Sequence, residues 1–398
     1  MIGNTSAPPA SPRLRHRRTA AAAGLAFAFA AALAVSACAS SSGSSTTASG
    51  TGASSTASGS SASSSTGAGN SAGGAASNAG FSACIMISNT GIADHSFNQA
   101  AWAAMTEAKS KLGITIKYLE QSGTVDFSTI GAEFVQADCS MIIGVGFDTE
   151  TTIDTLAKAN PSIKFAVIDD TLTTAEPNAV SLVYETNQAS FLGGYLAAGM
   201  SKSGTVGVYG NEAIAPVELY MSGYVYGVQY YNKVHGTSVK VIGWNPASGS
   251  GQFVGSFTDV NQGKLITEAE IQQSADVIFA VAGPIDEGTV EAMQAAGGPS
   301  AGYYTLWVDS DGCETNPSAC GELLSTVQKN IQPSLYQVIQ KTVTGSFPKG
   351  DYLGTLTDSG VGLAPYHQLT GKVPAALQKE VTALEQSVAA GTIKVQAY

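Results

Sequence analysis

The sequence predicts an α/β fold with two lobes, each a parallel sheet flanked by helices, hinged around a cleft. Short, nearly continuous apolar runs alternate with helical stretches from Phe81 onward, the pattern of parallel strands that are buried on both faces. The alternation starts again after Tyr184, which indicates a second lobe. A chain of 398 residues is long enough for two domains of ordinary size.

The first lobe is expected to comprise residues 81–185 and a later segment at about 326–348. Right-handed crossovers favour a strand order in which the first strand lies beside the third. Strands are expected at 83–88, 115–119, 141–145 and 164–168, and helices at 97–112, 127–137 and 151–159.

The second lobe is expected to comprise residues 186–325 and about 349–398. Strands are expected at 206–209, 239–242, 277–281 and 304–308, with helices at 187–200, 217–231, 259–273 and 286–295. A helix at 333–344, extended residues near 352–356 and a last helix at 375–388 follow.

The first 37 residues have the form of a secretory signal peptide. Four arginines and no acid precede residue 19, and an Ala-rich run over 20–35 is too short for a comfortable transmembrane span. The run ends Val35-Ser36-Ala37-Cys38, which resembles a bacterial lipobox and predicts cleavage before Cys38 and lipidation of its sulfur. An ordinary signal peptide with a chance cysteine is the alternative. We expect the general secretory route, with twin-arginine export as the other option.

Residues 38–80 are expected to form a lipidated cysteine followed by a tether. From residue 39 the segment is almost wholly Ser, Gly, Ala and Thr. It cannot bury enough apolar surface to offset its ordering entropy, so it is predicted to be disordered. Two acyl chains on Cys38 would hold the folded part on the extracytoplasmic face of the cell membrane.

The charge of the chain argues against a phosphorylated ligand and against nucleic acid. Removing the four leader arginines lowers the formal charge from −11 to −15, and every remaining cation is a lysine. Without arginine the mature chain lacks the planar donor fork that suits phosphate and carboxylate. We therefore expect no binding of nucleic acid.

Four cysteines remain after Cys38, an even number that predicts two disulfides in an exported protein. One would join Cys313 and Cys320 across a short loop, and the other would join Cys84 and Cys139 if their strands are neighbours. No metal site and no cofactor are expected, because the histidines are isolated and no CxxC motif occurs. These histidines are His95, His235 and His367.

Candidate site residues follow the predicted strands, because ligands of open α/β sheets lie beyond the carboxyl ends of the strands. In the polar loop after the first strand the candidates are Asn89, Asp94, Phe97 and Asn98, with helix capping through Asp94 or Ser96 as the alternative. Asp169 is a candidate after the fourth strand, although Asp169-Asp170 could be a turn. The other candidates lie on later loops and comprise Phe257, Gly283, Asp309 and Lys329.

Several segments, in order, resemble one family of ABC-transporter lipoproteins, the basic membrane proteins or purine nucleoside receptor A-like proteins. The resemblance covers the region from Phe81 to about Pro365. It is carried by segments 94–102, 142–147, 164–169, 191–198, 255–257, 275–279 and 308–311. The first of these reads Asp-His-Ser-Phe-Asn-Gln-Ala-Ala-Trp.

The resemblance implies a type I, periplasmic-binding-protein-like fold with three crossings between the lobes. It also implies that the protein binds a nucleoside, chiefly a purine nucleoside, and delivers it to the permease of an ABC importer. The lobes would close around the ligand as a hinge, and the protein would act as a monomer without catalysis.

The same resemblance assigns roles to the site residues. Phe97 and Phe257 would stack on the two faces of the base, and Asn98 and Asp169 would bond its polar groups. Asp309 would accept from ribose hydroxyls, Lys329 would donate to the sugar, and Gly283 would allow a close backbone approach. The first-lobe set would be Asn98, Asp169 and Lys329, and the second-lobe set would be Phe257, Gly283 and Asp309.

The first loop departs from the family pattern. The family has an Asp-x-Gly-Gly turn, whereas this chain has Asn89-Thr90-Gly91. An amide at Asn89 can donate as well as accept a hydrogen bond, so the base preference could differ.

Three alternatives stay open. The ligand could be another heteroaromatic solute such as a flavin, or the chain could act as a surface sensor without transport. An enzyme such as a nucleoside hydrolase is disfavoured, because no aspartate cluster near the first strand and no Ser-His or Cys-His constellation is evident.

Overall fold

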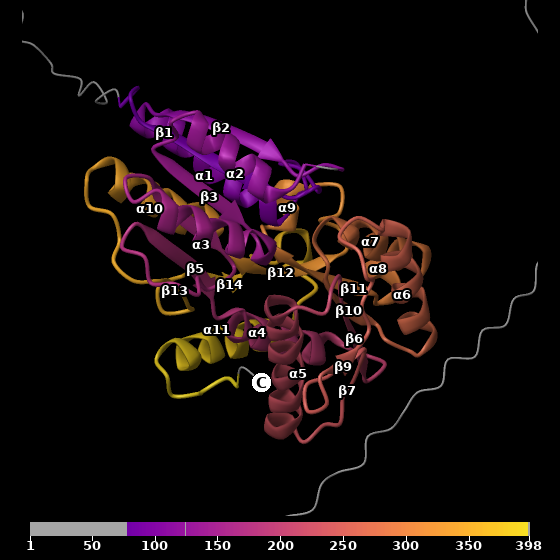
Figure 1. Cartoon of the computed structure of the whole chain (residues 1–398). Coiled ribbons are helices and arrows are strands. Elements are labelled where there is room, and N and C mark those ends of the chain that lie inside the picture. Colours follow the sequence, from indigo (N-terminus) through magenta and orange to yellow (C-terminus); the bar gives the residue numbers. More distant parts are fainter. Residues whose placement is uncertain (1–77, 124, 397–398) are drawn as a thin grey trace, which may run out of the picture. The chain divides into compact units, whose positions relative to one another are not determined.

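Two six-stranded sheets form the framework of residues 78–123 and 125–396, the part of the chain that this computed structural model describes (Figure 1). The expected signal peptide, Cys38 and the tether up to residue 77 lie outside the described residues. Among the described helices, none is both long and apolar enough to cross a membrane.

The first sheet has the strand order β13-β5-β4-β3-β1-β2, and all its pairings are parallel. Its strands are β1 (Ser82–Ile87), β2 (Thr115–Glu120), β3 (Met141–Val145), β4 (Lys164–Ile168), β5 (Ala179–Tyr184) and β13 (Tyr352–Gly354). Its helices are α1 (Phe97–Leu112), α2 (Phe127–Gln136), α3 (Glu150–Ala159) with the short η1 (Phe147–Thr149), and α10 (Ile331–Val343).

The second sheet has the order β14-β12-β11-β10-β6-β7, parallel except where β14 joins β12. Its strands are β6 (Thr205–Gly210), β7 (Lys240–Ile242), β10 (Val277–Val281), β11 (Tyr304–Asp309), β12 (Leu323–Lys329) and β14 (Val361–Leu363); β8 (Trp244–Asn245) and β9 (Ser250–Gly251) form a small hairpin. The helices are α4 (Thr186–Met200), α5 (Ala215–His235), α6 (Val260–Gln272), η2 (Gly283–Ile285), α7 (Asp286–Ala295), α8 (Gly298–Ala301), α9 (Gly312–Thr315), η3 (His367–Leu369) and α11 (Ala375–Ala389).

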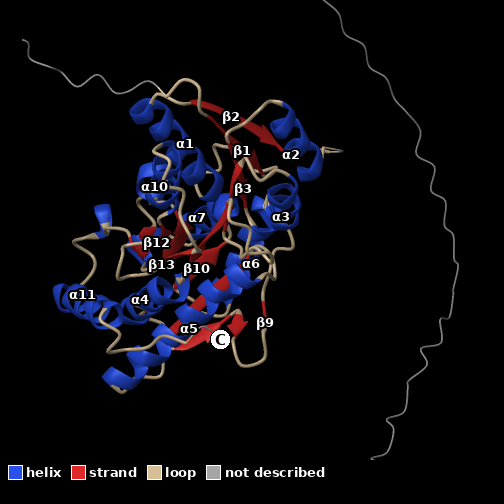
Figure 2. Ribbon diagram, turned by 60° about the vertical axis from the view of Figure 1, so that its left-hand side comes forward, coloured by secondary structure: helices blue, strands red, loops and turns tan. Residues whose placement is uncertain are grey.

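Helices cover both faces of each sheet (Figure 2), which explains the near-continuous apolar strands. Along β1, Ile85 and Ile87 belong to the core on the α1 side, whereas Met86 packs with α2 and α3. In the second sheet, Phe279 packs toward α4 and α5, and Ile278 toward α7. The expected α/β class with helix-flanked parallel sheets is confirmed.

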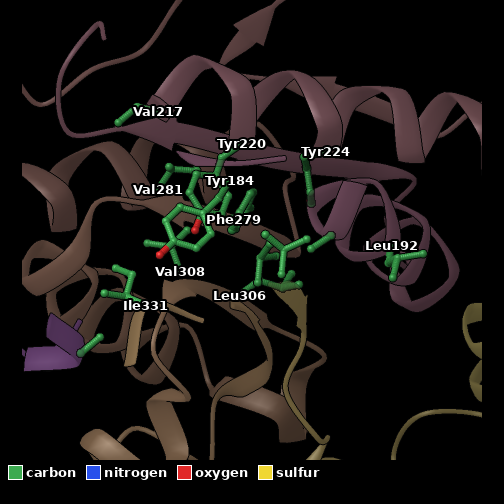
Figure 3. Close-up of a cluster of buried hydrophobic side chains, with 14 of the residues drawn as sticks. Tyr184, Leu192, Val217, Tyr220, Tyr224, Phe279, Val281, Leu306, Val308 and Ile331 are labelled. Carbon is green, nitrogen blue, oxygen red and sulfur yellow. The ribbon is translucent and has the colours of Figure 1, made fainter. Parts of the chain in front are cut away.

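The core of the second sheet depends on close packing between α4 and α5. Glycine makes this approach possible, because a Cβ added at Gly194 would lie 2.0 Å from the carbonyl oxygen of Tyr224. Tyr224 and Tyr220 project from α5 toward Phe279 (Figure 3), with ring centroids 5.2 Å and 6.2 Å from its ring. This cluster holds Tyr220 in place at the edge of the site described below.

Two segments lie in the other sheet from the one expected. The strand β12 (Leu323–Lys329) was not predicted, and it places residues 326–329 in the second sheet instead of the first lobe. The short strand β13 pairs with β5 in the first sheet, although residues 349–398 were assigned to the second lobe. The strand β13 has only three residues, too few to show a periodicity that would assign it to one sheet.

The chain passes between the two sheets three times: from β5 into α4, from β12 into α10, and from β13 to β14. Glu185 precedes α4 and Asn330 precedes α10, and the two residues have nearly the same backbone angles. These are φ −78° and ψ 61° for Glu185, and φ −78° and ψ 62° for Asn330. The amide of Glu185 donates to Gly354 O at 2.8 Å, and that of Asn330 donates to Gly360 O at 2.9 Å. The third crossing therefore bonds to the other two.

Both pairs of cysteines are bonded. Cys84 on β1 joins Cys139 just before β3, with Cα atoms 6.1 Å apart. The strands β1 and β3 are neighbours, as expected from right-handed crossovers. Cys313 and Cys320 close the shorter loop, with Cα atoms 4.6 Å apart.

A buried carboxyl on α6 predicts a pH-dependent stability. Glu270 is fully buried, and Cβ atoms added at Gly207 and Gly243 would lie 2.1 Å and 2.6 Å from its oxygens. Burial raises its pKa to about 8, so the folded state keeps a proton that the unfolded state loses at lower pH. Stability contributed by this group is therefore present below the unfolded pKa and lost as the pH rises toward 8.

We expect Glu270→Gln to remove about 3 kcal/mol of the decline in unfolding free energy between pH 5 and pH 8. Urea unfolding at both pH values measures it, with Glu268→Gln on the same helix as the control. Equal declines in the wild type and Glu270→Gln would show that Glu270 ionises freely in the folded protein.

Candidate ligand-binding site

A cavity of about 290 Å³ lies where the carboxyl ends of strands from both sheets face each other. Loops after β1, β3 and β4 meet loops after β6, β10 and β11 along its wall. All nine residues expected to contact a ligand line this cavity: Asn89, Asp94, Phe97, Asn98, Asp169, Phe257, Gly283, Asp309 and Lys329.

Asp94 organises the loop between β1 and α1. Its carboxylate accepts hydrogen bonds from the amides of Ser96, Asn98 and Gln99 at 2.9–3.0 Å, which satisfies free N–H groups at the start of α1. Burial raises the pKa of Asp94. Asp94 therefore caps the start of α1, as the alternative interpretation expected, and its oxygens bond to backbone amides of its own loop and helix.

Asn98 lines the cavity and has an unpaired acceptor. It is 1% exposed, and its amide nitrogen donates to Ser88 Oγ at 2.9 Å and Thr90 Oγ1 at 2.7 Å. Its amide oxygen is buried and has no protein partner. Because a buried polar atom without a partner is costly, this oxygen fits a ligand that donates a hydrogen bond.

Asp169 and Asp309 occupy equivalent places at the ends of β4 and β11. Both adopt left-handed backbone conformations, with φ of 70° and 67°. Such conformations are uncommon outside glycine, and aspartate is among the residues that tolerate them. The turn directs both carboxylates to the cavity from opposite sheets.

Lys329 bridges these two carboxylates. Its Nζ lies 2.5 Å from Asp169 Oδ2 and 3.7 Å from Asp309 Oδ1, and the residue is 3% exposed. Burial raises the pKa of Asp169, and the neighbouring ammonium opposes that rise. Lys329 is the last residue of β12, so it lies on the second sheet. The expectation that it belongs to the first lobe is wrong, because β12 was not predicted.

Aromatic rings surround the ammonium of Lys329. Its Nζ lies 5.0 Å from the centroid of Phe97, 5.2 Å from that of Tyr220 and 5.9 Å from that of Tyr184. Ring faces attract a cation that has been removed from water. Phe97 therefore already has a partner in the protein.

Asp309 is held by two hydroxyl groups. Ser96 Oγ donates to its Oδ2 at 2.7 Å, and Tyr220 OH donates to its Oδ1 at 3.1 Å. Burial and the nearby carboxylate raise the pKa of Tyr220, so its hydroxyl stays a donor. A carboxylate has about four acceptor positions, which leaves capacity for a ligand hydroxyl pair.

Phe257, the other aromatic residue expected to stack on the ligand, lies at the rim of the cavity. Phe257 lies 6.5 Å, ring to ring, from Phe147, which is 38% exposed. Gly283 has φ of 63°, and an added Cβ would come 3.7 Å from Ser96 Oγ. Asn89 also lines the cavity but is exposed.

Several residues of the cavity wall were not predicted from the sequence. Phe147 and Asp148 lie just beyond the end of β3 and could have been found by the strand-end rule, as could Asn211 after β6. Tyr220 could not, because it lies within α5 and has no distinctive local pattern.

Among the described residues, one group brings three possible metal-ligating atoms within 4.8 Å of one another: Asp311, Cys313 and His367. The sulfur of Cys313 is bonded to Cys320, so it is not a free thiolate. Asp311 instead accepts from the Cys313 amide and pairs with His367 Nε2 at 2.7 Å.

Comparison with known proteins identifies several relatives by sequence. The chain is 28% identical over 213 residues to an uncharacterized lipoprotein of Pyrococcus furiosus, a match that covers 52% of this chain and 52% of that protein. The chain thus spans about half the length of that relative. It is 25% identical over 315 residues to the ABC transporter nucleoside-binding protein BmpA of Lactococcus lactis, covering 75% of this chain and 86% of that protein.

A solved structure shows the same fold. The ABC transporter solute-binding protein of Aeropyrum pernix superposes with a TM-score of 0.69 at 23% identity, over 79% of this chain and 92% of that chain. The family model Bmp, described as ABC transporter substrate-binding protein PnrA-like, matches residues 81–398. Its members are substrate-binding proteins of ABC transporters and not enzymes. The chain therefore belongs to the Bmp family of PnrA-like ABC transporter substrate-binding proteins.

Proposed function

We propose that this protein is anchored by a lipid on Cys38 at the extracytoplasmic face of the membrane and delivers a nucleoside, with purines favoured, to an ABC permease. The relative from Lactococcus lactis is named a nucleoside-binding protein, and the relative from Pyrococcus furiosus is named a lipoprotein. The protein would act as a monomer. Its two lobes, residues 81–185 with β13 and residues 186–325 with the whole of β12, would close on the ligand.

One observation carries the ligand class: the cavity combines aromatic faces with acceptors from both sheets. Phe97 and Phe257 offer flat apolar surfaces, and stacking on an aromatic side chain contributes about 1–3 kcal/mol per base. Asn98 Oδ1 is a free acceptor at one place, and Asp309 retains acceptor capacity at another. A base that donates hydrogen bonds, joined to a sugar with paired hydroxyls, satisfies these groups together.

Charge supports a neutral ligand. The carboxylates of Asp94, Asp148, Asp169 and Asp309 line the cavity beside a single lysine. That lysine is already bonded to Asp169. A phosphate would meet uncompensated negative charge here, so the proposal is a nucleoside and not a nucleotide.

The direct experiment is mass spectrometry of small molecules released when the purified chain is denatured, followed by calorimetric titration of the refolded chain with a nucleoside panel. A purine nucleoside released or bound supports the proposal. A coloured preparation that releases a flavin, or a chain that binds no nucleoside, overturns it.

We expect Phe257→Ala to weaken purine nucleoside binding about 5- to 150-fold, equivalent to about 1–3 kcal/mol of stacking. Phe257→Trp should restore most of the affinity, because the larger ring keeps the stacking face. Phe347→Ala is the control, since Phe347 lies away from this cavity under Lys164. Calorimetric titration measures all three, and an unchanged affinity in Phe257→Ala removes this residue from the site.

A further inference from the structure

A set of hydrogen bonds outside the cavity joins the first loop to the disulfide-closed loop. His95 Nδ1 donates to Thr315 O at 2.7 Å, and Thr315 Oγ1 donates back to His95 O at 2.8 Å. Ser310 Oγ donates to Ser96 O at 3.0 Å. We call these three bonds the clasp. None of its four residues, His95, Ser96, Ser310 and Thr315, is among those that line the cavity.

The clasp connects the two sheets on the side where their loops meet. His95 and Ser96 follow β1 of the first sheet, whereas Ser310 and Thr315 follow β11 of the second. The bonded residues are separated by more than 200 positions in the chain, at 214 and 220 residues. Rotation of one sheet away from the other would therefore break all three bonds.

The shape of each loop suits this contact. His95 has φ of 57°, and this turn is held by the bond from its amide to Gln99 Oε1 at 3.2 Å. Thr315 ends α9, a helix of four residues. So short a helix has little stability of its own.

The disulfide fixes α9 in position. Cys313 lies within α9, and its partner Cys320 is 4% exposed beside Ala319. Ala319 packs with Trp307 and Leu323 in a small buried cluster that Cys313 also contacts. The disulfide thereby ties the hydrogen-bonding end of α9 to the core of the second lobe.

We propose that the clasp holds the cleft closed and sets the rate at which the solute leaves, with the Cys313–Cys320 disulfide keeping α9 in place to form it. His95, Ser96, Ser310 and Thr315 act as positioning residues that do not touch the solute. The kinetic part of this inference rests on the proposed nucleoside-binding function, whereas the closure part does not.

The test uses the full chain and tritiated inosine chased with unlabelled inosine. Loss of one hydrogen bond in Thr315→Val should speed inosine dissociation about fivefold, and the double variant Thr315→Val with Ser310→Ala about 25-fold. Ser318→Ala is the matched control, because Ser318 bonds to Asn316 within the same loop. Its dissociation rate should stay within twofold of the wild type.

Hydrogen exchange of the solute-free chain tests closure without any ligand. Amides near Phe147 and Phe257, which face each other at the rim and are not part of the clasp, should exchange faster in the double variant than in Ser318→Ala. A change confined to the clasp loops would mean local loosening and would overturn the proposal. If inosine and other nucleosides do not bind the wild type, the proposed function fails and rim exchange alone decides on the clasp.

The disulfide arm compares two pairs of substitutions. Cys313→Ser with Cys320→Ser should speed inosine dissociation and rim exchange, whereas Cys84→Ser with Cys139→Ser should leave the rate of inosine dissociation unchanged. Dissociation rates within twofold of the wild type in the clasp variants and in the Cys313 and Cys320 pair would overturn the proposal.

Discussion

Replacement of Lys329 by methionine is expected to destabilise the folded chain by about 3–5 kcal/mol, the usual effect of removing one partner from a buried ion pair. The Lys329 side chain is 3% exposed, and its ammonium lies 2.5 Å from Asp169 and 3.7 Å from Asp309. Without it, two carboxylates from opposite sheets remain buried near each other. Urea unfolding at pH 7 measures the loss.

A surface lysine gives the matched control. Lys117 pairs with Glu133 at 2.9 Å, but both side chains are about half exposed. Exposed pairs contribute about 0–1 kcal/mol, so Lys117→Met should have a small effect. Combining Lys329→Met with Asp169→Asn should recover part of the stability, since one uncompensated charge is removed. If Lys329→Met lowers the unfolding free energy no more than Lys117→Met does, Lys329 does not compensate the charge of the two carboxylates.

The loss of stability in Lys329→Met should depend on pH. The pKa of Asp169 is already raised by burial, and Lys329 opposes that rise. Removing Lys329 should raise this pKa further, so the Lys329→Met variant should be less impaired at pH 5 than at pH 8. An equal loss of stability at both values would contradict this explanation.

Removal of the Cys84–Cys139 disulfide is expected to lower the unfolding free energy by about 4 kcal/mol, because the bond joins residues 55 positions apart. The shorter Cys313–Cys320 bond, with a separation of 7 residues, should contribute about 2 kcal/mol by the same chain-entropy argument. Thermal unfolding of the two Cys→Ser pairs orders these effects. A larger loss from the Cys313 and Cys320 pair would show that native contacts of the α9 loop dominate over chain entropy.

Most of the strands in which every buried residue is apolar could be predicted from the sequence. The strands Met141–Val145, Lys164–Ile168 and Val277–Val281 have the bounds that were expected. The strand β12 was missed because Ser325 and Thr326 interrupt its apolar pattern. Both are buried, and their hydroxyls are satisfied by Ala364 O at 2.8 Å and by the amide of Gly312 at 3.1 Å. Those partners lie on other elements, so local sequence cannot reveal them.

The site was predictable where it follows strand ends. Asp169 directly follows β4, Asp309 ends β11 and Gly283 lies two residues beyond β10, and all three line the cavity. Tyr220 was not predictable, because its bond to Asp309 depends on how α5 packs across the second sheet. The clasp was not predictable either, since it joins residues about 220 positions apart.

The three crossings between the sheets restrict how the protein can open. Glu185 and Asn330 have matching backbone angles, and both are hydrogen-bonded to the third crossing. Joints of this kind absorb a rotation by small changes in φ and ψ, but a sliding displacement would have to break the bonds between the crossings. We therefore expect a single rotational degree of freedom. With one axis of motion, the two loops of the clasp separate and meet again in the same alignment, so each capture of a solute ends in the same geometry.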